Sequence, residues 1–446
     1  MILAQPANLK KLARERMART GESYTTARKN ILTDKPEGPR AARAAAARNY
    51  AQEAKDARYA EKHGKPKPKP KPAPAPSPAE ELPEYPAPTE VVQYDAGLWH
   101  RVLTQAGVSN PATGEPLSEA LLAGLAGGIG FMAFTFEYEQ ATTVTLVTRA
   151  HPEPYTQNLL RRCGAKVTER TTGSSDSATE YLDAGLDAGR AVVVRVAVSA
   201  LPWIEAGEVD EADIIDVAIV GEHEDDLLID DGSGALMPIS PNDLAVARAK
   251  RKKEKNWQAW IPSSRSPNLD TLSANVLEAV TETNGRLLGT LELKGIPEHF
   301  ANRVGIAGMH TWVESLRDTN GKKGWTQIFA DPQRLETGLA QLHGFMTDTR
   351  FGGLGGLRGL YADFLDECEQ FPGLEPLAEH AADYAQLAAD WIDLSEMVDP
   401  EIDPETRSEL FARMADQMEK IAAAEERAAT ALASTLSRLK ASKTER

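Results

Sequence analysis

Seven carboxylates lie in one short stretch of this 446-residue sequence, IIDVAIVGEHEDDLLIDDG, which runs from residue 214 to residue 232. Such a density of acids is typical of a metal site, of a catalytic acid cluster, or of the solvated tip of a β-hairpin. Runs of β-branched and aliphatic residues flank the segment GEHEDD, and this pattern predicts a hairpin whose tip opens at Gly221. Four acids would then lie at the tip, in water: Glu222, Glu224, Asp225 and Asp226.

Three acids of the same stretch, Asp216, Asp230 and Asp231, fall within or at the end of the expected strands. A charge at such a position costs free energy unless it is exposed or paired. These three carboxylates are therefore the ones whose chemistry needs an explanation.

The elements that position these acids follow from hydrophobic periodicity. The spacing predicts helices over residues 96–108, 117–128, 154–164, 177–189 and 240–251. It predicts strands over residues 142–149, 165–172, 190–198, 214–221, 225–231, 235–240 and 256–261. A leading helix followed by a mostly antiparallel sheet indicates an α+β domain over residues 91–262, and residues 263–446 are predicted to form a mostly helical domain.

The N-terminal region differs in charge from the rest of the chain. Residues 1–72 hold 18 Lys plus Arg against 7 Asp plus Glu, a balance of +11, and the remainder carries −27. Residues 1–63 are predicted to be a basic helical arm, which resembles short N-terminal segments of many actinobacterial proteins. Such an arm could contact nucleic acid or an acidic partner, or fold back on its own body. Residues 64–90 are rich in Lys and Pro and predict an extended spacer.

Composition excludes several classes of protein. No apolar run approaches the roughly 18 residues of a membrane span, and no signal peptide opens the sequence, so we expect a cytoplasmic protein without membrane contact. The two cysteines, Cys163 and Cys368, offer neither a disulfide framework nor a metal-ligand spacing. We expect no cofactor and no metal, and the sequence leaves the oligomeric state open.

Several segments resemble the N-terminal domain of the butirosin biosynthesis protein H family: LSEALLAGLAGGIGF, LDAGRAVVVRV, DVAIVGEHEDDLLIDDGSGALMPISPNDLAVARA and NWQAWI. The segment beginning FGGLGGLRGLYADFL resembles the helical domain that accompanies it, and the resemblance extends over roughly residues 91–432. It implies a papain-like, peptidase C39-like fold and an acyltransferase-type ancestry.

The resemblance also implies a catalytic site. Such a fold places a Cys nucleophile at the start of the first helix, a His at the start of a central strand, and an Asp or Asn on the next strand. These positions are Tyr94, Asp216 and Asp231 here, so thiol and imidazole are both missing. His100, on the first helix, is the histidine nearest to the missing thiol and is expected to be structural.

These replacements favour a catalytically degenerate homologue that acts as a binding or scaffold protein. One alternative is an active acyltransferase or hydrolase that uses Asp216 and Asp231, or a relocated Cys163, on an acyl thioester or an acyl carrier protein. A second alternative assigns the function to residues 1–72, as an arm that binds nucleic acid or an acidic partner.

A glycine-rich segment, RFGGLGGLRGLYADFL, is a candidate ligand site. Free backbone N–H groups ahead of a helix attract anions, and a phosphopantetheine or carrier-protein phosphate would suit them. The alternative is a close helix–helix approach that requires glycine. The candidate residues are Gly352, Gly353, Gly355, Gly356 and Arg358.

Overall fold

The computed structural model describes residues 83–446 except residues 140, 152–153, 206–212, 251, 293–295 and 445–446. The predicted arm, residues 1–63, lies outside the described residues. So does the predicted linker, residues 64–90, as far as residue 82. Residues 82–446 belong to one compact unit. The predicted boundary between residues 91–262 and 263–446 stays a prediction, because one hydrophobic core contains side chains from both parts.

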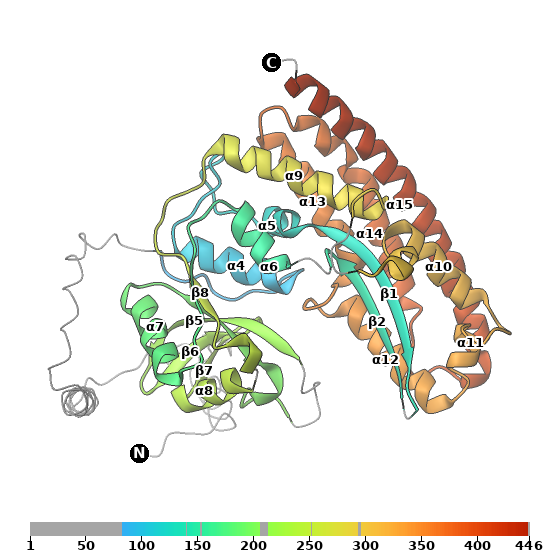
Figure 1. Ribbon diagram of the computed structural model, residues 1–446, viewed down its shortest axis with the longest axis horizontal. Coiled ribbons are helices and arrows are strands. Elements are labelled where there is room, and N and C mark those ends of the chain that lie inside the picture. The colour runs from blue at the N-terminus through green and yellow to red at the C-terminus, as the bar shows by residue number, and fades with distance from the viewer. Residues whose placement is uncertain are drawn as a thin grey trace, which may run out of the picture. The chain divides into compact units, whose positions relative to one another are not determined.

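A six-stranded antiparallel sheet carries the acidic stretch (Figure 1). Its strands lie in the order β3 (Thr168–Arg170), β8 (Gln258–Trp260), β4 (Val192–Ala197), β5 (Ile214–His223), β6 (Asp226–Asp230) and β7 (Leu236–Ile239). Every neighbouring pair in this order is antiparallel. The predicted α+β class is therefore confirmed, and each strand expected here is present.

The predicted hairpin of β5 and β6 is confirmed, but its tip is shorter than expected. The turn consists of Glu224–Asp225 alone, while Glu222 and Asp226 pair within the ladder. Glu224 adopts a left-handed φ of 57°, which a tight turn between paired strands demands. The prediction failed because the ladder passes through Gly221 at a register shift, so glycine marks an irregularity inside β5 rather than its end.

Helices cover both faces of this sheet. Because side chains alternate along a strand, Val192, Val194 and Val196 of β4 pack in a core cluster with α7 (Ser175–Asp187) and α8 (Pro241–Ala249). Val193 belongs to the other core, which includes α4. The remaining helices of this region are α4 (Tyr94–Gln105), α5 (Glu119–Ala126) and α6 (Tyr155–Arg162).

A second sheet consists of one long hairpin, β1 (Ile129–Glu137) and β2 (Thr142–Arg149). The sequence predicted β2 but not β1. The apolar run IGFMAF directly follows the apolar helix α5, so periodicity did not separate the strand from the helix before it. The positive φ of Gly127 and Gly128 ends the helix and redirects the chain. Figure 1 shows the hairpin lying along helices α10 and α12.

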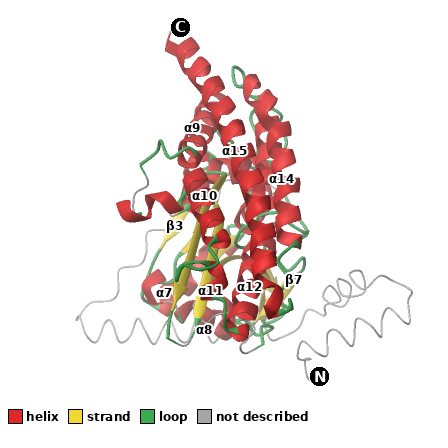
Figure 2. Ribbon diagram, turned by 90° about the vertical axis from the view of Figure 1, so that its right-hand side faces the viewer, coloured by secondary structure: helices red, strands yellow, loops and turns green. Residues whose placement is uncertain are grey.

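The C-terminal part is helical, as predicted. Polar caps begin two of its helices: Asn268 accepts from two backbone N–H groups of α9, and Asp331 accepts from Arg334 ahead of α12. Figure 2 shows α14 running alongside α15. Its α-helices are α9 (Leu269–Leu287), α10 (Gly305–Arg317), α11 (Trp325–Ile328), α12 (Pro332–Thr347), α13 (Arg358–Glu367), α14 (Ala381–Glu396) and α15 (Arg407–Thr444).

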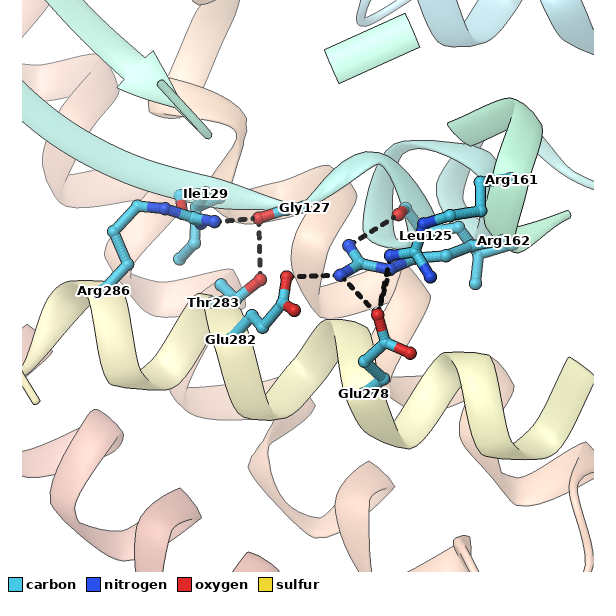
Figure 3. Close-up of polar contacts among 9 residues, drawn as sticks. All are labelled: Leu125, Gly127, Ile129, Arg161, Arg162, Glu278, Glu282, Thr283 and Arg286. Carbon is cyan, nitrogen blue, oxygen red and sulfur yellow. Dashed lines mark hydrogen bonds and ion pairs between the residues drawn. The ribbon is translucent and has the colours of Figure 1, made fainter. Parts of the chain in front are cut away.

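Helix α9 holds the junction between α5 and β1 (Figure 3). Its Thr283 hydroxyl donates to the carbonyl of Gly127 at 2.7 Å, and Arg286 donates to the same carbonyl at 3.0 Å. Arg162 of α6 donates to the carbonyl of Leu125 at 3.2 Å. Where the backbone turns from helix to strand, its carbonyls have no partner within a helix or a sheet. A buried carbonyl without a donor costs free energy, and these side-chain donors remove that cost.

The same close-up shows an ion-pair cluster on α9. Arg162, whose side chain is 1% exposed, pairs with Glu278 and Glu282. Arg161 also pairs with Glu278, at 2.6 Å. The arginine hydrogen bonds hold the pKa of Glu278 below its ordinary value. A buried guanidinium is tolerated here because carboxylates at the surface neutralise it.

Candidate functional site

Tyr94 is the first residue of α4, as the resemblance requires of the nucleophile position. The helix begins here because the Gln93 side chain accepts from the Ala96 N–H at 2.7 Å. Glu119 of α5 accepts from the backbone N–H groups of Val92 and Gln93, at 2.8 and 2.6 Å. The start of α4 is therefore fixed by the start of α5.

The Tyr94 hydroxyl forms a hydrogen bond with the backbone of β5. It donates to the main-chain carbonyl of Asp216 at 2.7 Å, and the side chain is 5% exposed. Burial, with smaller contributions from nearby carboxylates, raises the pKa of Tyr94 well above its ordinary value. The phenol therefore stays protonated near neutral pH and acts as a hydrogen-bond donor, not as a nucleophile.

Asp216 lies on β5 directly opposite Arg195 on β4. Arg195 donates to both oxygens of the Asp216 carboxylate, at 2.7 and 3.1 Å, and to Glu254 at 3.0 Å. The Arg195 guanidinium also stacks over the Trp257 ring. Burial raises the pKa of Asp216, although the Arg195 contacts oppose the shift. A carboxylate held at both oxygens is poorly placed to accept a proton from a substrate.

Asp231 directly follows the last residue of β6, and its carboxylate contacts Trp203 and Ser233. Its carboxylate accepts from the Trp203 indole N–H at 2.8 Å and from the Ser233 N–H at 3.0 Å. Its neighbour Gly232 packs so closely on the Tyr94 ring that a Cβ there would collide with it. The three predicted positions are thus close in space, but only Tyr94 and Asp216 share a hydrogen bond.

Asp230 is the carboxylate that shares a sheet face with Asp216. It pairs with Ala218, two residues along β5 from Asp216, so pleat alternation puts both acids on the α4 side. Asp230 is fully buried and accepts from Arg101 at 2.6 and 3.2 Å and from the Tyr85 hydroxyl at 2.6 Å. This ion pair joins α4 to the sheet.

A cavity of about 260 Å³ lies beside Tyr94 and Asp216. Asp231 is not among the residues that line it, whereas His151 is. Burial and the nearby Arg149 guanidinium lower the pKa of His151. His100, the histidine expected nearest to this site, instead places Nδ1 2.7 Å from the Leu117 carbonyl. The cavity is lined by the arginines Arg149, Arg195 and Arg350.

Both cysteines are buried away from this cavity. Burial raises the pKa of the Cys163 thiol to about 11, and burial also raises the pKa of Cys368. Among the described residues, none that lines the cavity carries a thiol. The relocated-nucleophile alternative, Cys163, therefore has no support from its position or its protonation.

The glycine-rich segment packs tightly against its neighbours. A Cβ at Gly352 or Gly353 would strike Thr148 or the Val92 carbonyl, and one at Gly356 would press on the Trp391 ring. The fourth glycine, Gly355, lies against α14 in the same way. These contacts favour the close-packing interpretation of the four glycines.

Arg358, the cation of that segment, is fully buried. It pairs with Glu425 of α15, at 3.1 and 2.5 Å, and donates to the carbonyls of Gly130, Thr148 and Gly356 at 3.0, 3.1 and 2.7 Å. Its donors are thus used within the protein, and the arrangement ties α13 to both strands of the β1–β2 hairpin and to α15.

Sequence reasoning did not select several residues that shape this site. Arg195 could have been found from the pairing of β4 with β5, because a buried Asp216 needs an adjacent cation. Arg149, His151 and Arg350 carry no local signal, since they reach the cavity from the end of β2 and from the segment after α12. Asp230 was among the carboxylates that the sequence marked for explanation, but its partners Arg101 and Tyr85 could not be identified without the fold.

Two further properties concern only the part of the chain that the structure describes. There, no group of three or more His, Cys, Asp or Glu side chains is placed to hold a metal ion. No helix in residues 83–446, outside the short gaps, combines the length and apolarity needed to cross a bilayer.

Tyr94, the first residue of α4, is hydrogen-bonded to β5, a central strand of the antiparallel sheet. The helical C-terminal part shares a hydrophobic core with this region. The chain is therefore an α+β protein with two parts. Residues 94–232 match the family described as Butirosin biosynthesis protein H, N-terminal, and residues 242–432 match a Domain of unknown function, DUF4872. The chain therefore carries a butirosin biosynthesis protein H-type N-terminal domain with its accompanying C-terminal domain. A comparison with curated proteins found no match.

Proposed function

We propose that this protein is a catalytically degenerate relative of acyltransferase-type proteins, and that it binds a ligand or partner through the cavity beside Tyr94. On this proposal the α+β part keeps a papain-like framework without its thiol chemistry. An acyl carrier protein is the partner class that the family resemblance suggests.

One observation carries the proposal. The residue at the nucleophile position, Tyr94, is buried, protonated and hydrogen-bonded to the backbone of the strand that would carry the base. The residue at the base position, Asp216, has both carboxylate oxygens occupied by Arg195. Covalent acyl transfer needs an ionisable nucleophile beside a free base, and this geometry supports neither role.

The test is intact-protein mass spectrometry after incubation with S-acetyl pantetheine and with an acylated acyl carrier protein. We expect no acyl adduct and no release of thiol above the rate in buffer. An adduct at Cys163 or at Tyr94, or turnover abolished by Asp216→Asn, would overturn the degenerate assignment.

A gain-of-function variant tests the positions themselves. Tyr94→Cys combined with Asp216→His returns a thiol and an imidazole to two positions that the hydrogen bond from the Tyr94 hydroxyl to the Asp216 main-chain carbonyl now joins. Recovery of thioester cleavage by this double variant supports the assigned register. The matched control is Tyr94→Ser with Asp216→His, which keeps the imidazole but lacks the thiol and is expected to stay inactive.

A further inference from the structure

A second cavity, of about 180 Å³, lies between β1 and the helices α10 and α11, apart from the site at Tyr94. One wall is a face of α10, formed by residues at positions i, i+3, i+4 and i+7: Gly308, Thr311, Trp312 and Ser315. The opposite wall is one face of β1, where the alternate residues Ala133, Thr135 and Glu137 point the same way. Ala133, Gly308 and Ser315 have short side chains, which leave part of the space between the strand and the helix unfilled.

The floor of the cavity is aromatic. Trp312 and Trp325 both line it, with ring centroids 5.7 Å apart and an interplanar angle of 65°. Ile328 adds an apolar side chain beside them. Trp312 is 5% and Trp325 2% exposed, so each residue offers the cavity only a small apolar area, which favours a compact apolar group in contact with the rings.

An indole N–H in this lining lacks an acceptor. Trp312 is 5% exposed, and its Nε1 has no hydrogen-bond partner among the described residues. A buried donor without a partner costs free energy, and native structures leave few such groups without a reason. This nitrogen exposes less than 1 Å², as do the unpartnered indole nitrogens of Trp99 and Trp391, so it belongs to the buried core and is not counted among the groups that meet a ligand.

Two cations also line the cavity. Arg303 is half-buried and Lys323 is exposed, and neither forms an ion pair with any residue that the structure describes. Glu137 is the single carboxylate among the described lining residues, so the lining carries a net charge of +1. This contrasts with the cavity at Tyr94, where Arg195 and Arg149 each hold a carboxylate.

We propose that this second cavity binds a small organic carboxylate with a planar apolar body. The indole rings and Ile328 contact the planar body, while Arg303 and Lys323 receive the carboxylate oxygens. The volume suits a compact molecule, because drug-sized ligands occupy pockets of roughly 300–1,000 Å³. This site is independent of the proposed function of the cavity at Tyr94.

The test is isothermal titration calorimetry of the full chain with benzoate, benzyl alcohol and inorganic phosphate at low ionic strength. We expect saturable one-to-one binding of benzoate, with the other two ligands at least about tenfold weaker. Benzyl alcohol lacks the charge-assisted hydrogen bonds of the carboxylate, and phosphate lacks the apolar body that contacts the indole rings. Lys323→Gln and Arg303→Gln should each weaken benzoate binding by about tenfold. The neighbouring exposed Lys322 does not line the cavity, so Lys322→Gln is the matched control and should bind like the parent.

Two more variants separate binding from folding. Lys323→Arg keeps the charge and should retain benzoate binding, whereas Ala133→Leu keeps both cations and should block it by filling the cavity. Absence of benzoate binding to the parent chain overturns the proposal. So does equal binding by Lys323→Gln and Lys322→Gln, or phosphate binding as tight as that of benzoate.

Discussion

Replacing Arg358 by methionine is the most informative single change for the stability of this fold. Arg358 and Glu425 are both fully buried, and the pair lies where α13, α15 and the β1–β2 hairpin meet. The substitution keeps an apolar side chain of similar length but leaves the Glu425 carboxylate buried without its cation. It also removes the donors of three backbone carbonyls: Gly130, Thr148 and Gly356.

The expected loss follows from these contacts. Breaking one side of a buried ion pair costs about 3–5 kcal/mol, because the remaining charge stays desolvated. Each carbonyl that loses its donor adds on the order of 1 kcal/mol. We therefore expect Arg358→Met to lower the free energy of unfolding by at least about 6 kcal/mol. With an unfolding entropy of about 2.1 cal/mol/K per residue over roughly 350 residues, this corresponds to a fall in Tm of about 8 °C.

The assay is urea denaturation followed by circular dichroism, with thermal melts in parallel. Arg358→Met with Glu425→Leu removes the lone charge as well, so the double variant should regain about half of the loss. Arg317→Met is the control, because Arg317 pairs with Asp416 at the surface and such a pair contributes under about 1 kcal/mol. A loss below about 1 kcal/mol for Arg358→Met would refute the reasoning from burial.

Three other outcomes are expected. Iodoacetamide at pH 8 should leave Cys163 and Cys368 unmodified in the native protein and alkylate both after unfolding, as peptide mapping would show, because burial raises both thiol pKa values. Tyr94→Phe should cost about 1 kcal/mol in urea denaturation, the contribution of one hydrogen bond, and a loss above about 3 kcal/mol would contradict this. Glu278→Gln should destabilise the protein at pH 7 but not below about pH 3. The pKa of Glu278 is depressed in the folded protein, so its ion pairs stabilise the fold above the unfolded pKa. This stabilisation disappears as the pH falls through the folded pKa. Equal effects of Glu278→Gln at pH 7 and pH 3 would exclude Arg161 and Arg162 as the cause.

The central strands β4 and β5 could be predicted because they are rich in β-branched residues, as in RAVVVRVAV and IIDVAIVG. β1 could not, because its apolar start continues the apolar pattern of α5 without a polar break. The position of Tyr94 at the start of α4 followed from family spacing. Its hydrogen bond to Asp216 did not, because a contact across 122 residues leaves no trace in local periodicity.

The rest of the candidate site depends on register and on distant chain segments. The family resemblance favoured Asp231 over Asp230, because local sequence does not distinguish two adjacent acids at a strand end. Only the pairing of Asp230 with Ala218 decides which of them faces α4. Arg350 reaches the cavity from the segment after α12, and no spacing rule connects it with Tyr94.

The tie between the β1–β2 hairpin and α15 has a consequence for synthesis on the ribosome. The carbonyl of Gly130 obtains its donor from Arg358, and Arg358 forms its ion pair with Glu425, about 300 residues after Gly130. At roughly 5–20 residues per second, about 15–60 s pass between the emergence of the hairpin and that of its last partner. Phe131 is buried in the finished protein against Trp312 of α10 and Trp391 of α14, which follow it by about 180 and 260 residues, so it lacks these partners for much of that interval. The growing chain is therefore a natural client for factors that shield apolar strands until translation ends.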